Sequence, residues 1–305
     1  MRLGIDLGGT KTEIVALDGS RQMLRERVAT PQSDYADVIR CMRDLVFAAD
    51  DKLGRKGSVG VAIPGTISRR TGLVKNANAT RLIGHPLDRD LAIAIGRPVC
   101  VANDANCFTL SEASDGAAQD VPVVFGVIVG TGCGGGISIN RRVLEGAHGI
   151  GGEWGHNPLP APRPDEVSKA PRCYCGRSGC IEAWISGTGL SVDFKRRSGR
   201  DLAGQEIAAA ATGGDAEAKA IMEDFYDRFA RSLATIVNVL DPDAIVIGGG
   251  LSNIDALYTE LPARIESYAF TPEGRTQVVK NRHGDSSGVR GAAWLWSEAE
   301  AAAMG

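Results

Sequence analysis

Three cysteines and one histidine near the middle of the chain have the residue types of a zinc site. They are His156, Cys173, Cys175 and Cys180, with the spacing H-x16-C-x-C-x4-C. Three thiolates and one imidazole fill the tetrahedral shell of a structural zinc ion. In a reducing compartment such clustering favours a metal over a disulfide, and Gly176 and Gly179 permit tight turns. We predict structural Zn²⁺ at these four residues, with a redox-active or free thiol set as the alternative.

Two acids flank these four residues and give the segment a second possible use. Glu153 precedes His156 by three positions, and Glu182 follows Cys180 by two. A bound metal would fix the direction of both carboxylates, so the metal would serve as a scaffold for a binding site. The simpler readings are exposed glutamates and a buried histidine without a ligand. By spacing alone, His148 could replace His156 as the fourth ligand.

Three glycine-rich segments each follow an apolar run, and together they could bind the phosphates of one nucleotide. They are Asp6-Leu7-Gly8-Gly9-Thr10-Lys11, Gly130-Thr131-Gly132-Cys133-Gly134-Gly135-Gly136 and Gly248-Gly249-Gly250. Glycine lets backbone N–H groups approach phosphate oxygens. The first segment adds a cation, Lys11, and a carboxylate, Asp6, that suits Mg²⁺ through water.

Simpler and competing readings of these segments remain. The second segment matches G-x-G-x-x-G, but a strand is expected where a dinucleotide fold needs a helix. The first lacks the P-loop pattern. A plain hairpin is the alternative for the first two, which lie between predicted strands.

Asn103-Asp104 ends a predicted strand and precedes a predicted helix. A carboxylate there could take the proton of a substrate hydroxyl during phosphoryl transfer. The alternative is that the pair caps the helix, and one residue could do both.

The elements that carry these residues alternate between strands and helices, which indicates an α/β fold. Apolar and β-rich runs predict strands, and helical spacing or helix formers predict helices. The predicted strands are 3–7, 12–17, 59–63, 98–102, 121–129, 137–140 and 244–247, and the predicted helices are 34–53, 106–118, 205–211, 216–240 and 288–300. A strand, glycine turn, strand unit occurs twice, so we expect two domains of related topology.

Composition excludes several classes of protein. The chain has 305 residues, a net charge of −3 and 43% hydrophobic residues, which fits a two-domain globular protein without a nucleic-acid footprint. No apolar run reaches membrane-spanning length, and the first residues lack a signal peptide. The odd number of cysteines, seven, argues against a secreted disulfide framework. We predict a cytoplasmic protein that binds neither nucleic acid nor membrane.

Taken together, the segments above resemble the ROK family of repressors, open reading frames and sugar kinases. The resemblance rests on the three glycine-rich segments and on Ala102–Asn106, Glu153–His156 and Cys173–Glu182, and it covers nearly the whole chain. Within the family the chain is most similar to bacterial fructokinases and mannokinases, which residues 75–80 and 283–291 support.

The resemblance implies an actin-like ATPase (ribonuclease H-like) fold, with two α/β domains around a central cleft. The expected domains are residues 1–117, joined by a C-terminal helix 286–305, and residues 118–285 with the zinc site. It implies that ATP and Mg²⁺ are bound by Asp6, Gly8, Gly9, Thr10, Lys11, Thr131, Gly132, Cys133, Gly134, Gly135, Gly248, Gly249 and Gly250. It implies Asp104 as the general base, and Asn103, Asp104, Glu153, His156 and Glu182 as sugar ligands, in a homodimer.

The function predicted from this resemblance is ATP-dependent phosphorylation of D-fructose at O6, and also of mannose. The alternatives within the family are a glucokinase and an N-acetylhexosamine kinase. A sugar-responsive repressor is disfavoured, because the first predicted strand begins at Leu3 and leaves no room before it for a DNA-reading module. A zinc-knuckle binding module without catalysis conflicts with the phosphate turns.

Overall fold

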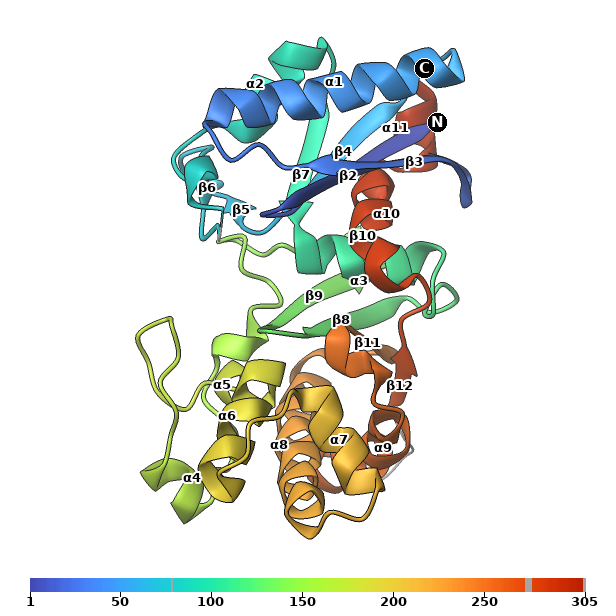
Figure 1. Ribbon diagram of the computed structural model, residues 1–305. Coiled ribbons are helices and arrows are strands. Elements are labelled where there is room, and N and C mark those ends of the chain that lie inside the picture. The colour runs from blue at the N-terminus through green and yellow to red at the C-terminus, as the bar shows by residue number, and fades with distance from the viewer. Residues whose placement is uncertain (78, 272–275, 304–305) are drawn as a thin grey trace. The chain divides into compact units, whose positions relative to one another are not determined.

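A computed structural model describes residues 1–77, 79–271 and 276–303, and it divides into two α/β units (Figure 1). Unit 1 comprises Met1–Asp120, Gly136–Gly151 and Asp285–Gly305, and unit 2 comprises Val121–Gly135 and Gly152–Gly284. The segment Gly136–Gly151 therefore belongs with unit 1, although the predicted domain 118–285 contained it. The cause is close packing of this segment against helix α3 of unit 1, described below.

Unit 1 is built around a five-stranded sheet in the order β3-β2-β1-β4-β7. Strands β1, β4 and β7 are parallel, and the hairpin β1–β2–β3 is antiparallel. Its elements are β1 Arg2–Leu7, β2 Lys11–Asp18, β3 Arg21–Ala29, α1 Tyr35–Leu53, β4 Ser58–Ile63, β5 Thr66–Ile67, β6 Val74–Lys75, α2 Leu87–Ile95, β7 Val99–Asn103, α3 Asp104–Ser114, β10 Arg142–Val143, α10 Ser287–Trp294 and α11 Glu298–Ala303.

The two faces of this sheet are covered by different helices. Leu3, Ile5 and Ile14 pack with the buried side of α1, whereas Val15 and Leu17 pack with Val289 and Ala293 of α10. Helix α10 lies directly on the sheet, because a Cβ atom added at Gly4 or Gly60 would overlap its backbone. Small residues of α10 permit this close approach: a Cβ atom added at Gly291 would overlap the backbone of Cys107 in α3.

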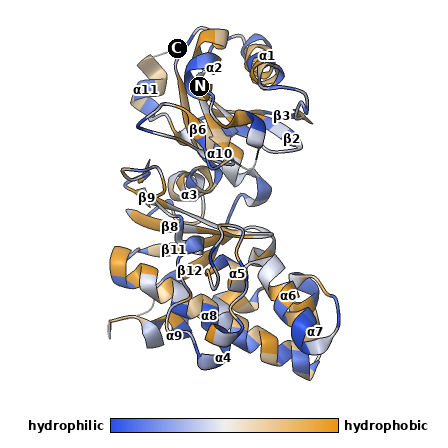
Figure 2. Cartoon of the chain, turned by 90° about the vertical axis from the view of Figure 1, so that its left-hand side faces the viewer, coloured by the Kyte–Doolittle hydropathy of each residue, from blue (hydrophilic) through white to orange (hydrophobic). Residues whose placement is uncertain are grey.

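Unit 2 contains most of the second sheet, whose order is β10-β9-β8-β11-β12. Strand β8 is strongly hydrophobic in Figure 2 and is parallel to β11, which is parallel to β12. The elements are β8 Val123–Val129, β9 Cys133–Ile139, α4 Pro164–Ser168, α5 Glu182–Ile185, α6 Gly187–Ser198, α7 Gly204–Thr212, α8 Ala216–Leu240, β11 Ala244–Gly248, α9 Ala256–Tyr268 and β12 Gln277–Lys280. The border between the units falls inside β9.

The glycine turn predicted at residues 130–136 was too long. The turn is short and β9 begins at Cys133, so Gly134, Gly135 and Gly136 lie in the strand. Their role is close packing: a Cβ atom at Gly135 would be 2.7 Å from Cδ1 of Trp154, and one at Gly136 would be 2.5 Å from Oγ1 of Thr109 in α3.

Two other expectations need correction. The predicted final helix is divided into α10 and α11, because Trp296 turns to donate its indole N–H to the carbonyl of Val59 at 2.7 Å and Ser297 starts a new turn with Glu300. Helix α3 begins at Asp104 and not at Asn106. Asn78, from the segment 75–80 that favoured the fructokinase branch, lies outside the described residues, as do residues 304 and 305 of the predicted C-terminal helix. Within the described residues, no helix has the length and apolar character of a membrane span.

Candidate active site and metal centre

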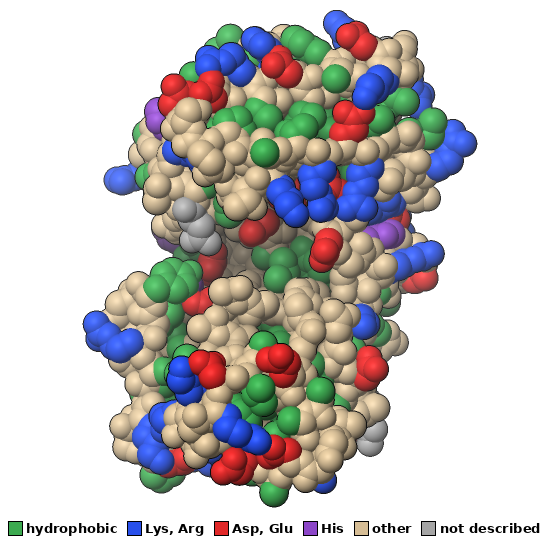
Figure 3. All heavy atoms as spheres, viewed as in Figure 1, with side chains coloured by type: hydrophobic (Ala, Val, Ile, Leu, Met, Phe, Trp, Pro, Cys, Tyr) green, Lys and Arg blue, Asp and Glu red, His purple; other side chains and the backbone are tan. Residues whose placement is uncertain are grey.

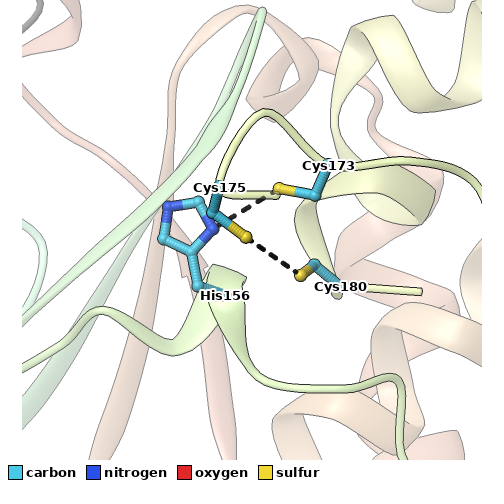
Figure 4. A group of neighbouring side chains, drawn as sticks. All are labelled: His156, Cys173, Cys175 and Cys180. Atoms are coloured by element: carbon cyan, nitrogen blue, oxygen red, sulfur yellow. Dashed lines mark hydrogen bonds between the residues drawn. The ribbon is translucent and has the colours of Figure 1, made fainter. Parts of the chain in front are cut away.

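The four predicted metal ligands come together in unit 2 (Figure 4). Their ligand atoms all lie within 4.8 Å of one another. Sγ of Cys173 is 3.6 Å from Nδ1 of His156, and Sγ of Cys175 is 3.6 Å from Sγ of Cys180. Sulfur ligands of one tetrahedral zinc ion, each about 2.3 Å from the metal, lie about 3.8 Å apart. The residues therefore fit a single zinc ion.

Local structure explains how a loop brings these ligands together. Gly176 and Gly179 have positive φ values of 90° and 74°, which the two turns of the knuckle require. The amide of Cys173 donates to the carbonyl of Arg177 at 2.8 Å, and Pro158 forms a bridge with Cys180. The predicted use of these two glycines is confirmed.

The thiols of the cluster differ in pKa. The neighbouring Arg177 side chain lowers the pKa of Cys175 to about 6. Burial raises the pKa of Cys180 to about 12. Cys180 would therefore ligate as a thiolate only with a cation beside it, whereas Cys175 is ready to do so at neutral pH.

His156 uses its two ring nitrogens for different partners. Nδ1 faces the sulfur atoms, and Nε2 lies 3.0 Å from the hydroxyl of Tyr174, which is 78% exposed. Tyr174 was missed by the sequence analysis, although its place between two cysteine ligands was a signal. Contact with Tyr174 occupies Nε2, so a direct bond from His156 to a sugar competes with this phenol.

A buried tryptophan fixes the segment that carries Glu153 and His156. Trp154 lies between Phe125 of β8 and Phe229 of α8, with ring centroids 5.6 and 6.2 Å away. Its indole N–H donates to the carbonyl of Gly134 at 3.1 Å. Since Trp154 is held on both sides, its neighbours are placed at the surface of unit 2, where Glu153 is exposed.

Glu182 connects the metal cluster with the second glycine segment. One carboxylate oxygen accepts a hydrogen bond from the amide of Cys133 at 2.9 Å, and the other lies 3.9 Å from Sγ of Cys173. From the sequence, Glu182 was expected only as a sugar ligand. In the structure the carboxylate also stabilises the start of β9.

The second and third glycine segments lie next to each other in unit 2. Gly130 and Gly250 are neighbours, and the carbonyl of Gly130 also accepts from the amide of Gly187 at 2.7 Å. Gly249 has a φ of 81° and packs against the backbone of Val129, so a side chain there would be strained. Two of the three predicted phosphate segments are thus brought together within one unit.

The first glycine segment lies in unit 1 and is a tight β1–β2 turn. The amide of Gly8 donates to the carbonyl of Lys11 at 3.0 Å. Thr30 donates its hydroxyl to the carbonyl of Gly8, and Gln32 donates its amide to the carbonyl of Gly9, both at 2.9 Å. The turn is therefore preorganised, and Thr10 and Lys11 are exposed beside it.

Asp6 and Asp104 stand at the ends of two parallel strands of unit 1, β1 and β7, with β4 between them. Asp6 is near the C-terminus of β1, and Asp104 directly follows β7. Burial raises the pKa of Asp6 to about 7, and the charges of Asp104 and Glu13 add to this shift. Each acid is found at the strand end where the sequence predicted it.

The alternative role of Asn103-Asp104 as a helix cap is realised mainly by the asparagine. Oδ1 of Asn103 accepts from the amides of Ala105 at 2.9 Å and Asn106 at 3.4 Å. One oxygen of Asp104 accepts from the amide of Ala105 at 2.8 Å. The cap fixes the carboxylate of Asp104 without using both of its oxygens for this purpose.

Comparison with known proteins then identifies the chain. The ROK family model matches residues 2–299. The chain belongs to the ROK family. It is 42% identical over 299 residues to an N-acetyl-D-glucosamine kinase of Yersinia enterocolitica, covering 97% of this chain and 99% of the relative. The ROK hexokinase structure from Thermus thermophilus has a TM-score of 0.85 and 32% identity, with 96% of this chain and 97% of that chain covered.

A further ROK structure, a glucokinase from Streptomyces griseus in complex with glucose and AMPPNP, has a TM-score of 0.75 and 27% identity, with 96% of this chain and 98% of that chain covered. The predicted actin-like α/β fold and the membership in the ROK sugar kinases are thus confirmed. The narrower prediction of the fructokinase and mannokinase branch is not supported, because the relatives above are named differently.

A buried ionic network stabilises the loop between His156 and Cys173 in this ROK protein. Glu166 is bound by Arg228 at 2.8 Å and by Arg231 at 2.9 Å, and Arg231 also donates to the carbonyls of Pro160 and Ala161. Burial opposes ionisation of Glu166, but the hydrogen bonds from Arg228 and its neighbours outweigh it and hold its pKa below the usual value. The network thus links α8 to the loop between His156 and Cys173.

We expect Arg231→Met to lower the free energy of unfolding by about 3 kcal/mol, because it leaves buried carbonyls and part of a buried carboxylate unpaired. Urea unfolding measures this change. The control is Arg264→Met, which removes surface pairs with Glu223 and Glu260 and should cost at most about 1 kcal/mol. Equal losses in the two variants would show that the network adds no stability.

The raised pKa of Asp6 predicts a pH dependence of stability. In the unfolded chain the Asp6 carboxyl has its ordinary pKa of 3.8, and in the folded protein it keeps its proton until about pH 7. Between these values the folded state binds more protons, so this group makes stability fall as pH rises. As pH rises from 4.5 to 8, the unfolding free energy of Asp6→Asn should therefore increase relative to that of the unmodified protein. A constant difference in unfolding free energy across this range would contradict the assignment.

Proposed function

We propose that this ROK protein is an ATP-dependent kinase that transfers the γ-phosphoryl group to O6 of N-acetyl-D-glucosamine. The observation that carries the sugar assignment is 42% identity to an N-acetyl-D-glucosamine kinase over almost the full length of both chains. The sequence-based alternative of an N-acetylhexosamine kinase is therefore better supported than fructose, its first choice.

Asp104 is proposed as the general base. Its place at the first position of α3, fixed by the cap at Asn103, gives a carboxylate of defined direction. It orients the O6 hydroxyl and accepts its proton as the new P–O bond forms. The transition state of phosphoryl transfer is loose, so positioning contributes more than early deprotonation.

The phosphate side is proposed to consist of the glycine segments of both units. In unit 1 these are Gly8, Gly9, Thr10 and Lys11, and in unit 2 they are Thr131, Gly132, Cys133, Gly134, Gly135 and Gly248–Gly250. Their backbone N–H groups stabilise developing negative charge without reorganisation. Mg²⁺, when bound, neutralises phosphate charge, and Asp6 is the carboxylate proposed to hold it through water.

The sugar side is proposed to consist of Asn103, Glu153, His156 and Glu182, with Tyr174 added from the structure. Charges of Glu182 and Glu153 contribute, after burial, to raising the pKa of Tyr174 to about 12, which indicates that these groups are close. Zinc, when bound to His156 and the three cysteines, stabilises the shape of this surface.

A coupled ADP-release assay over a panel of sugars tests the proposal. Glucose, mannose, fructose, N-acetylglucosamine and N-acetylmannosamine are compared at equal concentration. We expect the largest kcat/KM with N-acetylglucosamine. A larger value with fructose would restore the first prediction. A homodimer and the absence of nucleic-acid binding stay predictions of the sequence and its family resemblance.

A further inference from the structure

Charged side chains form a row across the first three strands of unit 1. Asp6 of β1 is paired with Glu13 of β2, and Glu13 is paired with Arg27 of β3. Residues directly opposite one another on paired strands lie on the same face. Arg25 lies on this face too, because it is two positions from Arg27.

This face is the one that α10 covers farther along the strands. Val15 and Leu17 follow Glu13 at every second position of β2, and they pack against Val289 and Ala293 of α10. Glu13 and Arg27 lie beyond that contact, toward the glycine turn, and Arg25 is opposite Val15. Lys11 points to the same face by the same alternation, at the end of the turn.

Glu13 is buried and holds both arginines. Its side chain is only 7% exposed, whereas those of Arg25 and Arg27 are 38% and 43% exposed. Nε of Arg25 lies 2.5 Å from one carboxylate oxygen, and Nε of Arg27 lies 2.6 Å from the other. Each guanidinium has five N–H donors, so this anchoring leaves donors for another anion. Figure 3 shows Lys and Arg side chains in a row where β3 crosses unit 1.

Thr30, the residue that directly follows β3, holds the phosphate turn in place. Thr30, three residues after Arg27, donates its amide to the carbonyl of Thr10 and its hydroxyl to the carbonyl of Gly8, both at 2.9 Å. The arginines and the turn are therefore parts of one rigid structure. Burial, Asp104 and Glu13 raise the pKa of Asp6, and Arg27 is the cation that opposes them, so its charge reaches that carboxylate.

Protection of the exposed edge strand β3 explains the arginines only in part. Charged side chains protect an edge while they stay in water. Glu26 does so on the opposite face, where it pairs with Lys52 of α1. Glu13, in contrast, lies on the interior strand β2, and burying a carboxylate is unfavourable unless it has a function or strong partners.

We propose that Arg25 and Arg27 bind the terminal phosphates of the nucleoside triphosphate, with Glu13 as the residue that positions them. The inference rests on the proposed kinase function and adds residues to its phosphate side. Planar guanidinium groups bind phosphate oxygens through two parallel hydrogen bonds, and a fixed orientation makes them more effective. Lys11 adds a point charge on the same face.

Arg27→Met and Arg25→Met test the proposal in steady-state kinetics with the full chain. We expect KM for ATP to rise about tenfold in each variant, while KM for the sugar changes less than about twofold. Arg27→Lys should restore part of the loss. Glu13→Gln should raise KM for ATP to a smaller extent, as expected for a positioning residue. The matched control is Arg55→Met, whose exposed partner Asp18 lies at the other end of β2.

Titration calorimetry with magnesium tripolyphosphate gives a readout that does not need turnover. Weaker binding by Arg27→Met than by Arg55→Met is expected, and equal binding would overturn the inference. If Arg27→Met does not fold, the comparison of Arg27→Lys with Arg55→Met decides in the same way. An unmodified protein without kinase activity would refute the proposed function. An active protein with unchanged KM for ATP in the arginine variants would refute this inference alone.

Discussion

Asp104→Asn is expected to lower kcat at least about 100-fold and to leave sugar affinity nearly unchanged. The amide has the shape of the carboxylate but cannot accept a proton, and a positioned base contributes about 100- to 10,000-fold. The cap formed by Asn103 keeps α3 in place, so the fold should not change. Steady-state kinetics and a sugar titration followed by calorimetry measure the two effects separately.

The control is Asp18→Asn, which removes an exposed carboxylate of the same unit. It should have normal kcat. If Asp104→Asn also turned over at the normal rate, Asp104 would not be the base. Loss of sugar binding with retained folding would instead make it a binding residue only.

Loss of the metal is the second change that we expect to have a large effect on the protein. Cys180→Ser should reduce zinc from about one per chain to almost none, because one buried ligand of four is lost. KM for the sugar should rise about tenfold or more, since the loop with Glu153 and His156 and the start of α5 with Glu182 lose their common support. Metal analysis and kinetics on the same preparation test both parts.

Cys41→Ser and Cys100→Ser are matched controls, because these cysteines lie in unit 1 and outside the cluster. They should keep zinc and activity. Metal-free protein with an unchanged KM for the sugar would show that zinc has no part in the site. The network around Arg231 should keep the unit folded after metal loss, so unfolding should follow the change in KM.

Much of the fold was predictable because burial and periodicity agree in most elements. The helix 34–53 is observed as α1, and the predicted strand 244–247 is observed in β11. Strand β3 was missed, since its alternation is obscured by exposed polar residues on both faces. The glycines of β9 were assigned to a turn because their requirement for close contact with Trp154 and Thr109 is a tertiary property.

The site was predictable where residue type limits the chemistry. The four proposed metal ligands were chosen from their types and spacing, and the structure brings them together with Nδ1 of His156 facing the sulfur atoms. The contact of Glu182 with the amide of Cys133 could not be predicted, because it joins residues 49 positions apart. The role of Glu13 also depends on strand register, which places Asp6 and Arg27 on either side of it.

The preferred sugar could not be predicted from the sequence, and the reason is physical. Fructose and N-acetylglucosamine both present hydroxyl groups to carboxylates, and they differ in ring shape and in the acetamido group. Discrimination depends on the shape of the pocket and on groups that pair with the amide. The segments 75–80 and 283–291 suggested fructose by resemblance only.

The central claim is most directly tested by identifying the product. The protein is incubated with ATP, Mg²⁺ and N-acetylglucosamine, and the mixture is analysed by ³¹P NMR with coupling to the sugar protons. We expect a new phosphomonoester coupled to the C6 protons, formed in equal amount to ADP and absent with Asp104→Asn. No such signal with N-acetylglucosamine, together with phosphorylation of fructose under the same conditions, would contradict the account.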